Sequence, residues 1–280
     1  MLKDVVDYLQ SALTSRTKEA AIPPKDEDEA QQRVAQLAAE LEPLVLSDSF
    51  LRKCLMCRDW HQQEAATVAR NFSRFRDSAG WPYRIECTED VKAALLSGLH
   101  WILPTRDIDG RPMLVYNGKV LDSINARITP QQRISIESLQ KMGCFLMELL
   151  TDDPACHQHG VALVFDVGGI TLGLLRHFTL ADIKRGVMMW KESFPCKLRR
   201  VYVLRASPVI SSIVHFVLGL LAKKIRDRVH FVKTDSPDDN QSDEPFWLFV
   251  RKDSVPPSLG GTLRFDWPAE VERIIASAAS

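Results

Sequence analysis

The chain has 280 residues, of which 45% are hydrophobic and 26% charged, so it can bury a core and form one or two domains. Its 36 basic and 36 acidic residues cancel, which excludes a global attraction to nucleic acid or anionic membranes and leaves only local charged patches. No run of 18 or more apolar residues occurs, so we expect a soluble or peripheral protein without a transmembrane segment.

The N-terminus and the cysteines indicate a reducing compartment. Asp4 and Asp7 interrupt the first ten residues, so no signal peptide is expected. The six cysteines are then expected to be reduced thiols in the cytoplasm.

Residues 1–95 predict a helical N-terminal part. Val34, Leu37 and Leu41 recur at helical spacing, which is typical of a surface helix. The helical pattern returns over 47–76, where Asp59 is a candidate N-cap.

From residue 96 onward, short strands alternate with helices. Strands are expected at 100–103, 112–116, 161–165 and 201–204. Helices are expected to begin at Thr129, running to Leu150, and at Thr179. This alternation predicts an α/β domain with a mixed, mostly parallel sheet.

The helix expected over 209–221 is apolar on most of its surface. Its polar or small positions, Ser211, Ser212, His215 and Gly219, fall within about a quarter of the helix circumference. Such a helix is buried in a core, covers a cavity with an apolar content, or meets lipid. Its apolar positions are Val209, Ile210, Ile213, Val214, Phe216, Val217, Leu220 and Leu221.

Basic residues flank this helix. Lys224 and Arg228 share one helical face, and Lys197 precedes the strand at 201–204. They indicate either a solvated helix end or, if they converge, an anion site suited to a phosphorylated headgroup.

Three other chemistries are not favoured. Cys54 and Cys57 with the Cys-His-x-His run at 156–159 lack the close spacing of a structural zinc site. Gly168-Gly169 matches no nucleotide-binding loop, and His215 has no nucleophile motif beside it. No metal, cofactor or catalytic residue is therefore expected.

Six fragments in the same order resemble the CRAL-TRIO lipid-transfer family over roughly residues 30–265. The pattern is most similar to the branch that includes the tocopherol transfer, retinaldehyde-binding and clavesin proteins. The fragments are FLRKCLMCRDW at 50–60, LPTRDIDGRPMLVY at 103–116, VALVFDVGGIT at 161–171, FPCKLRRVYVLRASP at 194–208, LLAKKIRDRVHF at 220–231 and VPPSLGGTLRFD at 255–266.

The resemblance implies a helical N-terminal lobe at 1–95, a CRAL-TRIO lipid-binding domain at 96–266 and a C-terminal tail at 267–280. The helix at 209–221 would be the gate of a hydrophobic pocket floored by the sheet. In the family branch, four basic residues at the gate's edge bind phosphatidylinositol bisphosphate; they map here onto Arg58, Lys197, Lys224 and Arg228.

The resemblance also implies the residues that line the pocket. Gly143 and Met147 stand where tocopherol binders carry hydroxyls, so a retinoid, another isoprenoid or a phospholipid is as reasonable a ligand as tocopherol. The implied pocket positions are Gln140, Gly143, Met147, Val161, Phe165, Ile170, Gly186, Met189, Trp190, Phe194, Leu198 and Val201.

The chain departs from the family pattern between the strand and the gate, where Leu204–Pro208 is one residue longer than usual. Cys196 also replaces a Glu found in fungal phosphatidylinositol-transfer relatives, which disfavours phosphatidylinositol as the pocket ligand. The expected function is non-enzymatic lipid binding and transfer at endosomal or other phosphoinositide-bearing membranes. The alternative is a phosphoinositide-sensing regulatory or scaffold module in membrane trafficking.

Overall fold

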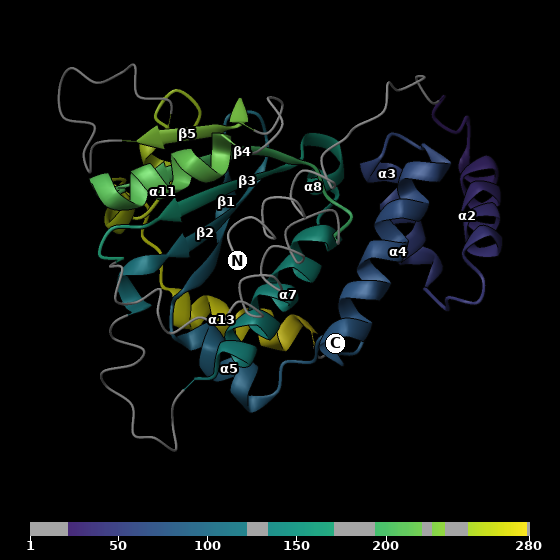
Figure 1. Ribbon diagram of the computed structural model, residues 1–280, viewed down its shortest axis with the longest axis horizontal. Helices are drawn as coiled ribbons and strands as arrows, with labels where there is room; N and C mark the ends of the chain where they lie inside the picture. Colours follow the sequence, from purple (N-terminus) through teal and green to yellow (C-terminus); the bar gives the residue numbers. More distant parts are fainter. Residues whose placement is uncertain (1–21, 122–133, 171–193, 220–225, 233–245, 279–280) are drawn as a thin grey trace.

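A five-stranded sheet forms the centre of the computed structural model, which describes residues 22–121, 134–170, 194–219, 226–232 and 246–278 (Figure 1). Its strands lie in the order β1-β2-β3-β4-β5; β1 pairs antiparallel with β2, and the other pairs are parallel. The expected α/β fold with a mostly parallel sheet is therefore confirmed. The strands are β1 (His100–Arg106), β2 (Pro112–Asn117), β3 (Val161–Asp166), β4 (Leu198–Leu204) and β5 (Val229–Val232).

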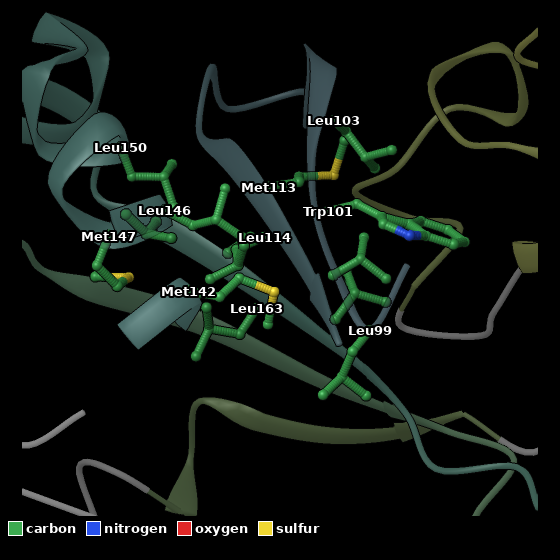
Figure 2. Packing of buried hydrophobic residues seen from close by; sticks show 14 of the residues in the cluster. Leu99, Trp101, Leu103, Met113, Leu114, Met142, Leu146, Met147, Leu150 and Leu163 are labelled. Carbon is green, nitrogen blue, oxygen red and sulfur yellow. The ribbon is translucent and has the colours of Figure 1, made fainter. Parts of the chain in front are cut away.

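Different segments of the chain cover the two faces of the sheet. Because successive side chains alternate, Leu114 and Leu163 lie on one face, which we call the inner face, beneath helix α7 (Ile136–Asp152) (Figure 2). Trp101 and Met113 lie on the opposite, outer face, which the C-terminal segment covers (Figure 2). The central strand β3 is buried from both sides, as its continuous apolar run predicts.

Helices α2 (Glu27–Leu41), α3 (Asp48–Cys57) and α4 (Gln62–Ala79) form the N-terminal lobe at one side of the molecule, whereas α5 (Glu89–Leu96) packs against α7 of the sheet domain (Figure 1). Val34, Leu37 and Leu41 are buried in its small core, so the spacing that predicted a surface helix marks its packed face.

One expectation about this lobe is wrong. The pattern over 47–76 is helical, as expected, and forms two helices separated by a turn at residues 58–61. Asp59 is not an N-cap: it has a φ of 53°, and α4 begins after His61. A carboxylate next to an apolar run resembles an N-cap in sequence. In the structure, the turn at residues 58–61 places the Asp59 carboxylate beside Lys197, with which it forms an ion pair.

The remaining described helices are α7, α8 (Pro154–His159), α11 (Pro208–Gly219) and α13 (Trp267–Ala278), with short 3-10 turns η1 (Gly118–Val120), η2 (Lys252–Ser254) and η3 (Pro257–Leu259). Helix α7 begins at Ile136 and not near Thr129, because the Ser135 side chain accepts a hydrogen bond from the Ser138 N–H. Thr129 itself and the helix expected at Thr179 lie outside the described residues.

The segment expected as a tail contains α13. Its Trp267 is buried, and the indole Nε1 donates a hydrogen bond of 2.6 Å to the Leu95 carbonyl of α5. Val271 and Ile274 also join the main core. Residues 267–278 therefore contribute side chains to the main hydrophobic core.

Gly160, between α8 and β3, should not tolerate a side chain. Its φ is +80°, and a Cβ would lie 2.5 Å from the Lys197 carbonyl oxygen. We expect Gly160→Ala to lower the free energy of unfolding by about 2–4 kcal/mol, through backbone strain and overpacking together. Gly80→Ala is the matched control, since Gly80 has a φ of +67° but no atom within 4 Å of the added Cβ. It should cost about 1 kcal/mol in urea denaturation, and equal losses for both variants would contradict the close contact.

Candidate functional site

The inner face of the sheet is apolar, and several of its large side chains are only half-buried. Strand register places Val161, Phe165, Leu198 and Val201 on this face, since Val161 pairs with Leu198 and Leu163 with Val201. Val161 and Val201 are buried, whereas Phe165 and Leu198 are only half-buried. Half-buried large side chains on an inner face are unusual in a close-packed core and are typical of the wall of a cavity.

Aromatic rings extend this surface across the sheet. Tyr116 of β2 lies 5.7 Å from Phe165 between ring centroids, and it is half-buried as well. On β5, the half-buried Phe231 stacks against His215 of α11 at 4.3 Å between ring centroids. Because α11 thereby reaches the inner face, the expected gate helix and the expected pocket wall are neighbours.

Helix α11 has apolar side chains on two sides. Ile210 is buried, whereas Val209 is 51% exposed. Ser212 and His215 are also exposed, so His215 is a packed and solvent-touching residue. Val214 is half-buried; the side chains of Ile213, Phe216 and Val217, and all of Leu220 and Leu221, lie outside the described residues.

The other implied pocket positions fall in three places. Gln140, Gly143 and Met147 recur at helical spacing along α7, and Ile170 lies beside Gly118 at the carboxyl end of the sheet. Phe194 packs against Phe72 of the N-terminal lobe, 6.0 Å away between ring centroids. Gly186, Met189 and Trp190 lie outside the described residues.

The junction that departs from the family pattern carries an anchored arginine. Arg205 has a φ of 56°, and its Nε donates a hydrogen bond of 2.8 Å to Asp166 Oδ1 at the end of β3. Its Nη2 also donates to the Ser258 carbonyl oxygen at 3.0 Å. Arg205 therefore ties the start of α11 to the sheet and to the C-terminal segment.

Three of the four expected headgroup residues lie in the described part of the chain, and all are half-buried. Arg58 follows the last residue of α3, Lys197 precedes β4, and Arg228 precedes β5. Arg228 Nη1 donates a hydrogen bond of 2.7 Å to the Leu198 carbonyl oxygen, which holds it beside the start of β4. Lys224 lies outside the described residues.

Two neighbouring arginines affect the charge of Arg228. Burial lowers the pKa of Arg228, and the positive charges of Arg199 and Arg58 lower it further. Arg58 and Lys197 also both act on the thiol of Cys57. The sequence did not assign Arg199 to this site, because helical spacing cannot relate residues on two different strands. We call Arg58, Lys197, Arg199 and Arg228 the basic cluster.

Comparison with known proteins places the chain in a family. Residues 96–261, more than half of the chain, match the CRAL/TRIO domain, and the chain belongs to this family of lipid-binding and lipid-transfer domains. No helix in the described part of the chain is long and apolar enough to cross a membrane.

The curated relatives are distant and longer. Human "Tyrosine-protein phosphatase non-receptor type 9" is 22% identical over 222 residues, covering 79% of this chain and 34% of that protein. Human "Alpha-tocopherol transfer protein-like" is 23% identical over 185 residues, covering 65% of this chain and 51% of that protein. The chain thus spans a third to a half of these relatives. The crystal structure of Sfh5 is similar with a TM-score of 0.46 and 11% identity, over 99% of this chain and 96% of that one.

Proposed function

We propose that this chain is a non-enzymatic lipid carrier, which holds a hydrophobic ligand against the inner face of the sheet beneath α11. The observation that carries the proposal is the half-burial of Phe165, Leu198 and Phe231 on a face that α7 and α11 cover. A ligand that covers these side chains gains roughly 25 cal/mol for each Å² of apolar surface removed from water. A retinoid, another isoprenoid or a phospholipid supplies such a surface.

Helix α11 would act as the gate of the pocket. The basic cluster, together with Lys224, would dock the protein on phosphoinositide-bearing membranes of the cytoplasm. The exposed Val209 supports contact of the helix with lipid. Arg58, Lys197 and Arg228 support headgroup binding, since each basic residue near an anionic surface contributes about 1 kcal/mol. If the headgroup binds the open state more tightly than the closed state, docking promotes ligand release.

Asp59 should weaken this docking. It forms an ion pair with Lys197, and its side chain is 66% exposed, so the pair competes with a lipid phosphate at the surface. We expect Asp59→Asn to bind vesicles containing phosphatidylinositol bisphosphate about two- to fivefold more tightly, the gain that a surface ion pair of at most about 1 kcal/mol permits. Glu42→Gln, an exposed site on another turn of the same lobe, is the control. Weaker binding by Asp59→Asn would contradict competition at Lys197.

The second candidate function is a phosphoinositide sensor that binds lipid without moving it. The match to about a third of a much longer relative favours it, because the domain there is one part of a longer chain. A transfer assay between donor and acceptor vesicles carrying a fluorescent lipid separates the two candidates. A carrier accelerates transfer, whereas a sensor binds the vesicles and leaves the transfer rate unchanged.

A variant that fills the proposed pocket tests whether transfer in this assay depends on the inner face. Leu198→Trp adds bulk to the inner face at a half-buried position, so it should reduce transfer several-fold and leave vesicle binding intact. Ile108→Trp is the control, because Ile108 is 55% exposed in the β1–β2 turn. Equal transfer by both variants would argue against a ligand on the inner face.

A further inference from the structure

One row of side chains crosses the inner face of the sheet from β1 to β5. Each member is paired with the next in the strand register, so the five side chains stand side by side on the same face. In strand order, the row consists of His100, Tyr116, Phe165, Val203 and Phe231. At the β5 end, Phe231 stacks against His215 of α11. The row therefore leads from the proposed gate helix to the β1 edge of the sheet.

The aromatic members of this row are less covered than the side chains next to them. Tyr116, Phe165 and Phe231 are half-buried. In the adjacent row beneath α7, Leu114 and Leu163 are buried (Figure 2). Because neighbouring strands lie about 4.8 Å apart, the row extends over about 19 Å from β1 to β5. It is therefore long enough for one extended hydrocarbon chain that lies across the strands.

His100, at the β1 end of the row, is a polar residue in an apolar wall. It is 8% exposed, and its ring packs edge-on against Tyr116 at 5.2 Å between ring centroids. Its buried Nδ1 has no hydrogen-bond partner among the described residues. The other described strand residues with such an atom lie on the outer face: Trp101, Arg200 and Tyr202. A buried polar atom without a partner costs free energy, which a hydrogen bond with a ligand in the pocket would offset.

The chemistry of the His100 ring favours a hydroxyl as this partner. Burial lowers the pKa of His100 to about 4, so the imidazole is uncharged near neutral pH. A hydroxyl both donates and accepts, so it pairs with Nδ1 whichever nitrogen carries the proton. A carboxylate brings a charge into the apolar site and pairs well only with a charged imidazole. A plain hydrocarbon leaves Nδ1 without a partner.

We propose that His100 determines the specificity of the inner-face pocket, which takes a single-chain lipid with a terminal hydroxyl. This inference rests on the proposed function, because it assigns the ligand of the same pocket. The hydroxyl forms a hydrogen bond with His100 at the β1 end of the row. The hydrocarbon chain lies along Tyr116 and Phe165 toward α11, so the polar end of the ligand is the end farthest from the gate.

The test is lipid uptake by the full chain from phosphatidylcholine vesicles that carry deuterated hexadecanol, pentadecanoic acid or heptadecane, which are matched in their number of non-hydrogen atoms. The protein is separated from the vesicles, and the lipids extracted from it are quantified by mass spectrometry. His100→Phe keeps a ring beside Tyr116 but removes the polar atom. We expect it to reduce hexadecanol uptake about tenfold relative to the wild type, and to leave uptake of the acid and the alkane within about twofold.

Two further variants separate recognition of the ligand from a structural role. His100→Gln, whose amide also donates and accepts, should retain hexadecanol uptake within about threefold. His230→Phe is the matched control, because His230 is half-buried on the outer face opposite Tyr202. It should leave all three uptakes unchanged. The urea midpoint of His100→Phe should be no lower than that of the wild type, since the variant removes an unpaired buried atom.

The outcomes distinguish this inference from the proposed function. Equal hexadecanol uptake by His100→Phe and the wild type, or a loss confined to the acid, would overturn the role of His100. Uptake of phosphatidylcholine from the same vesicles, with none of the three single-chain compounds, would overturn the ligand class and leave the proposed carrier standing. An extract without any lipid would contradict both.

Discussion

Replacing Arg76 with Met should lower the free energy of unfolding by about 3–5 kcal/mol, because it leaves a buried carboxylate without its partner. Arg76 is completely buried in α4 and forms an ion pair with Glu148 of α7, thereby joining the N-terminal lobe to the sheet domain. Its guanidinium also lies 4.9 Å from the ring centroid of Phe72 and 5.8 Å from that of Phe194. Glu148 in turn accepts a hydrogen bond of 3.0 Å from the Ile85 N–H.

The loss should depend on pH in a definite direction. Burial raises the pKa of Glu148 to about 7, although Arg76 lowers it in part. Without Arg76, the folded-state pKa rises further above the unfolded value, and keeping the carboxylate charged in the fold becomes more costly. A raised carboxyl pKa destabilises the fold as pH increases, so the loss should be larger at about pH 8 than at about pH 5.5.

Urea denaturation of Arg76→Met and Arg273→Met at both pH values tests this account. Arg273 forms an ion pair with Glu270 while its side chain is 69% exposed, so its loss should cost less than about 1 kcal/mol. The double variant Arg76→Met/Glu148→Gln should recover part of the stability, since no buried charge is then left unpaired. Two outcomes would contradict the role of the buried pair. Arg76→Met could be as stable as Arg273→Met, or its loss of stability could be the same at both pH values.

The second large effect concerns docking. Arg58→Glu/Lys197→Glu should reduce binding to vesicles that contain phosphatidylinositol bisphosphate by on the order of 100-fold, since each reversal removes an attraction of about 1 kcal/mol and adds a repulsion. Binding by the wild type should also weaken as salt is raised. Flotation of the protein with vesicles that contain or lack the phosphoinositide measures both effects.

The control for this experiment is a second double variant that changes the net charge by the same amount. Arg251→Glu/Arg264→Glu alters two exposed residues of the C-terminal segment, away from α3 and β4 in the sequence. It should bind within about threefold of the wild type, as expected for charges outside the contact region. Equal binding by both double variants, with or without the phosphoinositide, would rule out the basic cluster as the docking site.

The sequence was sufficient for elements whose pattern is local. The continuous apolar run at 161–165 and the helical spacing of Val34, Leu37 and Leu41 each gave the right element. The outcome at Asp59 shows the limit: a carboxylate before an apolar run can be a cap or a surface partner, and only the turn after α3 decides between them.

The candidate site depends more on tertiary structure than the elements do. The family resemblance assigned Arg58 to the site. Arg199 affects Arg228 as well, because β4 and β5 are neighbours in the sheet. Spacing likewise cannot show that the start of β3 meets the residue before β4, where the Val161 N–H donates a hydrogen bond to the Lys197 carbonyl oxygen. Arg205 shows the same dependence, as its contacts with Asp166 and Ser258 join three distant segments.

The central claim is that the inner face of the sheet holds a hydrophobic ligand. Native mass spectrometry of the purified chain, followed by organic extraction and incubation with vesicles of mixed lipids, tests it most directly. We expect a mass excess that corresponds to one apolar molecule, is lost on extraction, is regained from vesicles, and is strongly reduced in Leu198→Trp. A protein that shows only the mass of its polypeptide, both as purified and after exposure to vesicles, would contradict the claim.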